Sequence, residues 1–307
     1  MLHIDDAMVS KSVNSEDAIK VLKEAFIAFY QGQAGTQERV RTECAGIKLS
    51  TLGAVIPNQG YVGAKIYTTI AGKFKFVILL FSTKTGAPLA YFDAEAITRI
   101  RTAACSVIAA QKLAHPQSKK LAILGSGLQG IEHAVQFSKA YKLDEIHLYS
   151  PNITKARADA LQEKCGVPVQ MSGIEDAIKD ADIIVTASRS TTALFNGDSL
   201  PNNCFIAAVG SSLPTTRELD DKSLTRASII AVEWKHQTLQ EAGDLVLASP
   251  ETNAISKVAE LGELLSLERY ASLNTSSGIK IYKSVGIGLE DIAIAGLAYE
   301  KLEGKLT

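Results

Sequence analysis

The sequence predicts an α/β fold, with a doubly wound, Rossmann-type parallel sheet joined to a mixed α+β domain. Short apolar runs alternate with helical segments from residue 116 to about residue 285, as in parallel sheets covered by helices. A glycine-rich turn opens the first of these helices. The first 115 residues lack this alternation. We therefore expect two domains, one formed by residues 1–115 and 288–307 and the other by residues 116–287.

The first domain is expected to begin with a helix at residues 15–30, where Ile19, Leu22 and Phe26 follow helical spacing. Ser15 is the expected N-cap. Residues 39–92 contain β-type runs separated by Gly, Pro and Asn, and the last two predict a hairpin around residues 83–86. Residues 94–113 predict a second helix. A third, in the segment from residue 284, is expected to pack back on this domain.

The second domain contains a series of apolar runs typical of buried parallel strands. Helical segments separate the first four of them. The six predicted strands are LAILG, EIHLYS, VPVQM, DIIVTAS, CFIAAVG and IIAVEW.

Composition and charge exclude several classes of function. Lys and Arg total 32 and Asp and Glu total 33, which argues against nucleic-acid or anionic-membrane binding driven by bulk charge. The four cysteines are scattered without a CxxC pair, so we expect reduced thiols and no metal centre. The N-terminus carries acids where a signal peptide needs bases, and no apolar run reaches the ~18 residues of a membrane span. We expect a cytoplasmic protein with a small-molecule partner.

The most specific local feature is the turn LAILGSGLQG, which contains Gly125, Gly127 and Gly130. It follows an apolar strand and opens a helix, the context that a dinucleotide-binding turn requires. Gly125 permits the tight turn, Gly127 leaves room for a pyrophosphate, and Gly130 lets helix and strand approach. The helix N-terminus offers N–H groups to the phosphates.

The end of the next predicted strand bears on the choice of cofactor. NAD enzymes usually place an acid there to bind the ribose hydroxyl, whereas this chain has Ser150, Pro151 and Asn152. Ser150 and Asn152 are suitable donors to a 2′-phosphate, so NADP(H) is favoured and NAD(H) use stays open. Lys155 and Arg157 fit either a phosphate site or a solvated helix face.

Three cations of the first domain are candidates for binding a small anion. Lys65 lies in the apolar run VGAKIYTT, Arg101 lies among small residues in TRIRTAACS, and Arg41 precedes the β-type runs. The alternative for each is an ordinary surface salt bridge.

A polar loop, GSSLPTTRELD, follows the predicted strand that ends at Gly210. Ligands of open α/β sheets bind at such strand ends, which makes Ser212 and Thr216 candidate site residues. Helix capping by Thr215 or Thr216 ahead of Glu218 explains the same pattern equally well.

Five motifs together resemble the ornithine cyclodeaminase/mu-crystallin family over essentially the whole chain: GAKIYTT, RTAACSVIAA, LGSGLQG, VGSSLPTTRELD and KSVGIGLEDIAIA. The resemblance implies a Rossmann domain and a second domain for substrate binding and dimerisation. It implies that Arg41, Lys65 and Arg101 bind the substrate carboxylate, with Lys65 and Ser212 as the catalytic residues. The cofactor site that we expect comprises Thr102, Gly125, Gly127, Leu128, Gln129, Gly130, Ser150, Asn152, Val209, Gly210, Ser284 and Gly286.

One residue departs from the pattern of the cyclodeaminases, which carry Asp in a G-x-D-x-P loop. Here the loop is Gly210-Ser211-Ser212-Leu213-Pro214, and a serine hydroxyl does not take a proton at neutral pH as a carboxylate does. The resemblance therefore implies a homodimeric NAD(P)H-dependent reductase of cyclic ketimine carboxylates. Its substrates would be Δ1-pyrroline-2-carboxylate and Δ1-piperideine-2-carboxylate. A cyclodeaminase or hydroxyproline dehydratase-type lyase, and a non-catalytic crystallin-like binding protein, stay open as alternatives.

Overall fold

The computed structural model describes the backbone of residues 1–306 and the side chains up to residue 303. The chain divides into two compact units, residues 1–104 with 286–307 and residues 105–285. We expected boundaries at 115/116 and 287/288. The first division falls instead inside the helix α3 (Glu95–Leu113), which runs through it without interruption.

The first unit contains a seven-stranded sheet in the order β1-β7-β6-β5-β4-β2, with β3 paired to β4. Apart from the parallel pair β1 and β7, its strands are antiparallel. The predicted hairpin is present as β6 and β7. The strands are β1 (Leu2–Ile4), β2 (Gly35–Thr36), β3 (Val40–Cys44), β4 (Ile47–Ile56), β5 (Tyr61–Ile70), β6 (Lys73–Ser82) and β7 (Pro88–Asp93).

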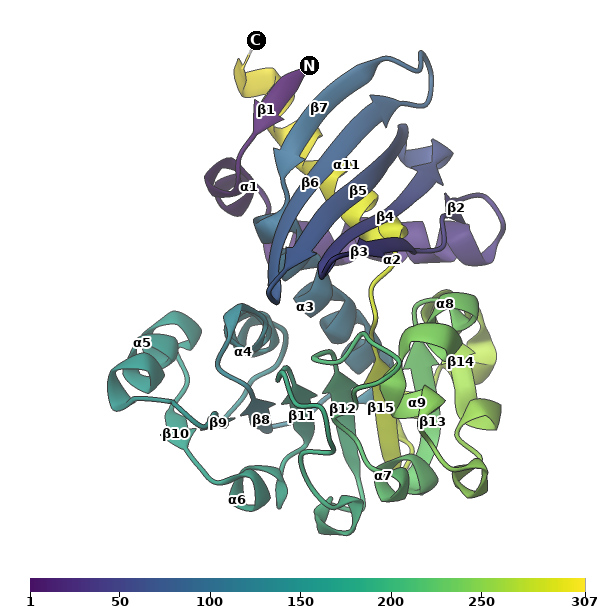
Figure 1. Cartoon of the computed structure of the whole chain (residues 1–307). Helices are drawn as coiled ribbons and strands as arrows, with labels where there is room; N and C mark the ends of the chain where they lie inside the picture. The colour runs from purple at the N-terminus through teal and green to yellow at the C-terminus, as the bar shows by residue number, and fades with distance from the viewer. Residues whose placement is uncertain (307) are drawn as a thin grey trace. The chain divides into compact units, whose positions relative to one another are not determined.

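The helix α11 (Gly288–Leu306) packs against β4, β5 and β6 and contacts α2 (Ser15–Tyr30) and α1 (Asp6–Ser12). The C-terminal helix thus packs on this unit, as expected (Figure 1). Ser50, Leu52, Ala54 and Ile56 of β4 are buried, and the side chains between them point to the other face. One face of the sheet is therefore covered by α11.

The second unit contains an eight-stranded parallel sheet in the order β10-β9-β8-β11-β12-β15-β13-β14. The chain runs outward from β8 to β10 and then returns to the other side of β8 with β11, which creates a topological switch point. This confirms the predicted doubly wound fold. The strands are β8 (Lys120–Leu124), β9 (Glu145–Tyr149), β10 (Val169–Met171), β11 (Ile183–Thr186), β12 (Cys204–Ala208), β13 (Ala227–Val232), β14 (Val258–Glu260) and β15 (Ile279–Lys283).

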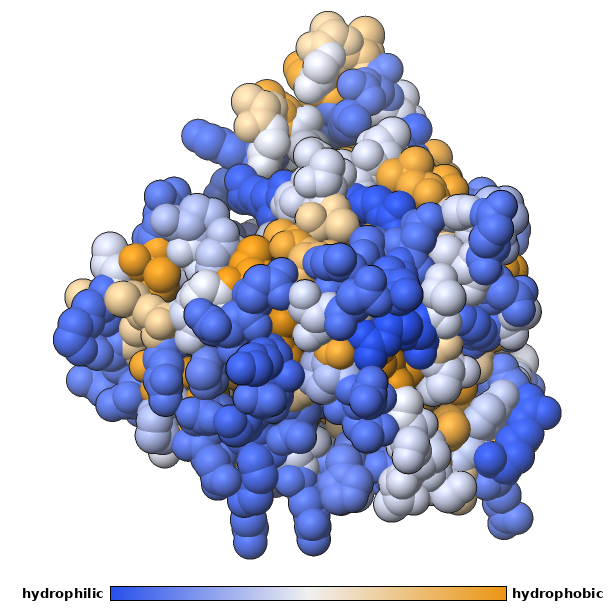
Figure 2. Space-filling model, turned by 90° about the horizontal axis from the view of Figure 1, so that it is seen from below, coloured by the Kyte–Doolittle hydropathy of each residue, from blue (hydrophilic) through white to orange (hydrophobic). Residues whose placement is uncertain are grey.

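Helices flank this sheet (Figure 1). A buried apolar core forms around it from residues such as Leu124, Ile184, Ile206 and Ile281. The helices are α4 (Leu128–Ala140), α5 (Lys155–Cys165), α6 (Ile174–Ile178), α7 (Asp221–Arg226), α8 (Lys235–Glu241), α9 (Gly243–Val246) and α10 (Leu261–Ser266). In the view of Figure 2, the visible surface is mainly hydrophilic with scattered apolar residues.

Three local expectations are corrected. The N-cap of α2 is Asn14, whose side chain accepts a hydrogen bond from the Asp17 amide at 2.9 Å, and Ser15 is the first helical residue. The last helix begins at Gly288, because residues up to Lys283 form the strand β15. Neither Thr215 nor Thr216 caps a helix, since α7 begins at Asp221 and is capped by Asp220.

Candidate functional site

The glycine turn joins β8 to α4 as predicted, and its three positions need glycine for different reasons. Gly125 has a φ of +126°, and a Cβ there would lie 2.4 Å from the Ala187 carbonyl oxygen. A Cβ on Gly130 would lie 1.8 Å from the Gly125 carbonyl oxygen. Packing within the unit therefore requires both. A Cβ on Gly127 meets nothing within 4 Å, so the space beside it is open, as a bound pyrophosphate needs.

The N-terminus of α4 begins at this open position. Gly127 is its N-cap and supplies no side-chain cap hydrogen bond. Leu128 is 58% exposed. The Gln129 carbonyl accepts a hydrogen bond from His133 Nδ1 at 2.7 Å, and the Ser106 hydroxyl lies 2.9 Å from Nε2. Burial lowers the pKa of His133 to about 4, so this histidine is neutral and braces the first turn of α4.

The end of β9 lies directly beside the glycine turn. Tyr149 pairs with Leu124 of β8, and its carbonyl accepts a hydrogen bond from the Gly125 amide at 2.8 Å. Ser150 follows and is half-buried, whereas Asn152 is exposed. Residues 150–154 contain no acid. The turn thus brings Ser150 to the position that follows the second strand.

Lys155 behaves as a residue of a solvated helix face. Its side chain is 81% exposed and forms an i,i+4 ion pair with Asp159 at 3.0 Å. Such exposed pairs contribute little to stability.

The ends of β12 and β15 bring three further candidates together. The Val209 amide donates to the Thr186 carbonyl at 2.9 Å, and the Ser284 amide donates to the Ala208 carbonyl at 3.0 Å. Val209 and Ser284 therefore follow adjacent strands at the carboxyl edge of the sheet, with Gly210 next in the chain. Ligands bind at this edge in open α/β folds.

Glu218 holds the segments at this edge of the sheet together, a role that its sequence context did not predict. The Glu218 side chain is fully buried and accepts four hydrogen bonds. They come from the Gly210 amide (2.8 Å), the Thr186 hydroxyl (2.8 Å), and the Ser188 amide and hydroxyl (2.8 and 2.6 Å). One carboxylate thus ties together the segments that follow β11 and β12. The only sequence signal was an acid in a loop rich in hydroxyl groups.

The loop that contains Ser212 rests on a second buried network. The Ser211 hydroxyl lies 2.6 Å from the Thr216 carbonyl and 2.7 Å from its hydroxyl. Lys283 donates to the Ser211 carbonyl at 2.6 Å and pairs with Asp244 at 2.8 Å. Thr216 therefore braces the loop, and Ser212 is half-buried beside this network.

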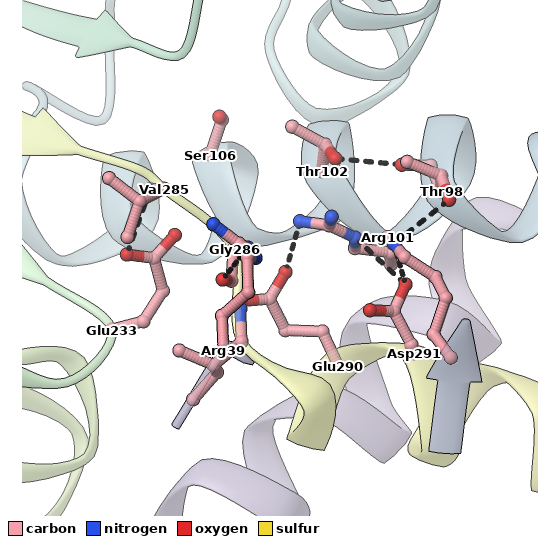
Figure 3. A network of polar contacts seen from close by, with 12 residues as sticks. Arg39, Thr98, Arg101, Thr102, Ser106, Glu233, Val285, Gly286, Glu290 and Asp291 are labelled. Atoms are coloured by element: carbon pink, nitrogen blue, oxygen red, sulfur yellow. Dashed lines mark hydrogen bonds and ion pairs between the residues drawn. The ribbon is translucent and has the colours of Figure 1, made fainter. Parts of the chain in front are cut away.

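The first unit gathers Lys65 and Arg101 into one buried cluster with two acids of α11. Figure 3 shows Arg101 of this cluster beside Glu290 and Asp291. Lys65 Nζ lies 2.9 Å from Asp291 Oδ1 and 3.2 Å from the Thr98 hydroxyl. Arg101 Nε lies 3.3 Å from the same Asp291 oxygen, and Arg101 Nη1 lies 2.6 Å from Glu290 Oε2. Both cations are at most 6% exposed and both acids are fully buried. The surface salt bridges considered from the sequence are thus wrong for Lys65 and Arg101.

The environment of Lys65 lowers its pKa, so that it releases its proton more readily than an exposed lysine does. Burial is the largest influence and lowers the pKa of Lys65 to about 8, although Asp291 acts in the opposite direction. Arg101 and Arg39 also lower it by charge repulsion. The Lys65 ammonium lies 5.1 Å from the centre of the Phe76 ring. Lys65 is therefore an ammonium at neutral pH that loses its proton only slightly above it.

Gly286 is required by its neighbours in this cluster. Its φ is +75°, and a Cβ there would lie 2.6 Å from Arg101 Nη1. Its carbonyl accepts a hydrogen bond from Arg39 Nη2 at 2.7 Å. A side chain at position 286 would displace the guanidinium of Arg101.

Arg41 lies on the same face of the sheet as Lys65. It pairs with Ser50 of β4, which pairs with Tyr67 of β5, and cross-strand partners share a face. Tyr67 shares that face with Lys65, two residues away. Thr102 is buried on α3, and its hydroxyl donates to the Thr98 carbonyl at 2.7 Å. The roles predicted for Arg41 and Thr102 stay predictions.

Three charged residues of the cluster were absent from the sequence-based set: Arg39, Glu290 and Asp291. A signal for the acids was present, since two adjacent acids directly precede the apolar run IAIAGLA of the last helix. Acids are, however, ordinary in the first turn of a helix. Taken together, the cluster places guanidinium and ammonium groups in a buried, low-dielectric setting, which suits binding of a small carboxylate.

Other classes of site are not found in the part of the chain that the structure describes. Within residues 1–306, no group of three or more His, Cys, Asp and Glu side chains is arranged to hold a metal ion. The helices of the same residues include none with the length and apolarity needed to cross a membrane. No disulfide joins Cys44, Cys105, Cys165 or Cys204 among the described residues.

The geometry agrees with the comparison to known proteins. Residues 2–306 match the model of the ornithine cyclodeaminase/mu-crystallin family. The chain belongs to this family. This confirms the resemblance on which the site residues were predicted.

Individual members of the family resemble the chain to different degrees. A Δ1-pyrroline-2-carboxylate reductase from Bacillus cereus is 35% identical over 264 residues, which cover 84% of this chain and 78% of that protein. The structure of the probable ornithine cyclodeaminase from Bordetella pertussis Tohama I has a TM-score of 0.96 and 52% identity, covering 99% of this chain and 98% of that one. Thermococcus litoralis Δ1-pyrroline-2-carboxylate reductase in complex with NADH and L-proline has a TM-score of 0.94 and 25% identity, covering 100% and 99%.

Proposed function

We propose that this family member is an NAD(P)H-dependent reductase of cyclic ketimine carboxylates. It converts Δ1-pyrroline-2-carboxylate, Δ1-piperideine-2-carboxylate or both to L-proline and L-pipecolate. The observation that carries the proposal is the combination of the buried cations Lys65 and Arg101 with Ser212 in place of a loop carboxylate. Reduction of a preformed imine needs the cations but no base, whereas deamination needs the base.

The glycine turn fits a nicotinamide dinucleotide. Gly127 leaves open space beside the uncapped N-terminus of α4, where N–H groups and the helix dipole favour phosphate. When bound, the nicotinamide supplies the hydride for the imine carbon. Because no acid follows β9, no carboxylate beside Ser150 and Asn152 repels a 2′-phosphate. NADPH therefore binds at least as well as NADH.

Arg101 and Lys65 bind the substrate carboxylate together with Arg41. Their buried positions strengthen each charge-assisted hydrogen bond relative to water. Holding the imine by its carboxylate fixes the carbon to be reduced, and such positioning supplies much of the rate.

Lys65 is also the proton donor in this proposal. Its pKa of about 8 keeps it protonated at neutral pH and close to the ideal range for a general acid. It gives its proton to the imine nitrogen. Because the protonated form is required, kcat/KM falls as the pH rises through the pKa of Lys65.

The lyase remains the second candidate because of one observation. The Bordetella pertussis relative, 52% identical, is described as a probable ornithine cyclodeaminase. Ser212 argues against that chemistry here, since no carboxylate stands at its position to take a proton. Retention of the cations argues against a purely non-catalytic binding protein.

We also infer a homodimer in the cytoplasm. The face of the first unit's sheet opposite α11 exposes Val40, Ile47, Leu49, Val55, Ile70 and Val77, each between 41% and 53% exposed. Contiguous apolar surface of this kind is typical of an interface. The four free thiols favour a reducing compartment.

A steady-state assay tests the proposed activity. Purified protein is mixed with each imine and with NADH or NADPH, and loss of the reduced nicotinamide is followed together with formation of L-proline or L-pipecolate. We expect turnover of at least one imine, with NADPH at least as effective as NADH. Absence of turnover of both imines with both cofactors would contradict the proposal.

A further inference from the structure

Asp291 lies at the centre of the buried cluster and has no role in the proposal so far. One oxygen, Oδ1, contacts both Lys65 Nζ at 2.9 Å and Arg101 Nε at 3.3 Å. The other oxygen, Oδ2, is buried and has no hydrogen-bond partner among the described residues. A buried carboxylate left half-satisfied needs an explanation beyond structural pairing.

We propose that Asp291 is a positioning residue whose single oxygen orients Lys65 and Arg101 and sets the charge carried by Lys65. This inference deepens the proposed function and rests on it. Lys65 is surrounded by groups from every element packed against it. These are Asp291 of α11, Arg101 and Thr98 of α3, Arg39 ahead of β3, Tyr67 of β5 and Phe76 of β6. Glu290 of α11 pairs with Arg101.

The balance of charges around Lys65 explains why Asp291 matters. Burial, Arg101 and Arg39 all disfavour the ammonium form, and Asp291 favours it both by its charge and by its hydrogen bond. Loss of that charge makes a buried ammonium beside two guanidinium groups considerably less stable. Lys65 would then release its proton at a lower pH and carry less charge at neutrality.

Orientation is the second effect of the same oxygen. Lys65 comes from β5 and Arg101 from α3, so their side chains share no backbone support. Both long side chains lose considerable rotamer freedom when fixed, and the contact to Asp291 Oδ1 holds their nitrogens together. Binding of a carboxylate by both cations needs this shared geometry.

Asp291→Asn removes the charge with almost no change of shape and is the central variant. We expect the alkaline limb of the kcat/KM profile to move to lower pH by about one unit or more. We also expect activity to be largely recovered in acid. An equal loss of activity at every pH, with the limb unmoved, would mean a merely structural role and would overturn the proposal.

Two further variants separate charge from position. Glu290→Gln is the matched control, because Glu290 is an equally buried neighbouring acid that accepts hydrogen bonds from Arg101 Nη1 and the Ile287 amide. We expect it to raise the KM of the imine while moving the limb less than Asp291→Asn does. Asp291→Glu keeps the negative charge but places the carboxylate on a longer side chain. The alkaline limb of the kcat/KM profile should therefore stay near its original pH while kcat falls. A limb that moves equally in all three variants would contradict the assignment.

A readout without catalysis keeps the inference independent of the proposed activity. The 13Cε signal of Lys65, assigned by its disappearance in Lys65→Met, is titrated by NMR in the wild type and in the Asp291 and Glu290 variants. We expect the Lys65 titration to move to lower pH in Asp291→Asn, and to move less in Glu290→Gln. If the wild type reduces neither imine, the proposed function fails while this titration still decides the role of Asp291. An unshifted titration in Asp291→Asn overturns the inference.

Discussion

At the level of single residues, the buried cations of the cluster could be predicted from the sequence, whereas the acids that pair with them could not. Lys65 in an apolar strand and Arg101 among small residues are unusual on composition alone, so the sequence identified both. Glu290 and Asp291 stand in the first turn of α11, where acids are common because they favour the helix dipole. Only the fold brings residues 65, 101 and 291 together, and no local pattern encodes that contact.

Arg101→Lys tests whether Arg101 binds the substrate carboxylate, and it disturbs the buried cluster less than a neutral substitution does. Lysine keeps a positive charge for Glu290 and Asp291 but lacks the planar fork that bonds two groups at once. We expect kcat/KM for the imine to fall on the order of 10²-fold, because a charge-assisted contact to the substrate is lost. Steady-state kinetics measure this, and circular dichroism checks the fold.

Arg99→Lys is the matched control on the same helix, since Arg99 donates a hydrogen bond to the Ser10 hydroxyl at 3.1 Å. It should leave kcat/KM almost unchanged. Equal kinetics for wild type and Arg101→Lys would remove Arg101 from the substrate site. Arg101→Ala is a poorer test, because it removes the guanidinium that pairs with the buried carboxylate of Glu290, and breaking a buried ion pair costs roughly 3–5 kcal/mol of stability.

At the level of elements, the alternation of strands and helices and the glycine turn were predictable, whereas the strand β15 was not. Its sequence, IKIYK, carries lysines at positions 280 and 283 that are typical of an exposed edge. Instead it lies between β12 and β13, and all five of its residues are buried. Lys283 is accommodated by its ion pair with Asp244, a long-range contact that the sequence pattern does not reveal.

The end of β9 yields a prediction about cofactor choice. Under the proposed cofactor role of Ser150, Ser150→Asp would place a carboxylate beside the ribose, where it would repel a 2′-phosphate and accept a hydrogen bond from a 2′-hydroxyl. We expect the KM for NADPH to rise at least about tenfold, while the KM for NADH is unchanged or lower. NADH thus serves as the internal control. A wild-type enzyme that uses NADH alone would show that the prediction from residues 150–157 is wrong.

At the level of the whole molecule, the uncovered sheet face yields a prediction about assembly. The variants Leu49→Glu and Val77→Glu place carboxylates on this face. They should convert the proposed dimer to a monomer, because association would have to remove the new carboxylates from water. Analytical ultracentrifugation at micromolar concentration measures the change. Met171→Glu, at an exposed apolar residue of β10 in the other unit, is the control and should stay dimeric. A monomeric wild type would contradict the prediction.

In the proposed function, Ser212 makes this chain a reductase of preformed imines rather than a deaminase. The most direct measurement compares two reactions on one preparation of the wild-type protein: ammonia release from L-ornithine with NAD, and NAD(P)H oxidation with Δ1-pyrroline-2-carboxylate and Δ1-piperideine-2-carboxylate. We predict that imine reduction dominates and that ammonia release is negligible beside it, because no carboxylate at position 212 takes the proton. Ammonia release from L-ornithine at a rate comparable to imine reduction would contradict the proposed reductase and establish the lyase in its place.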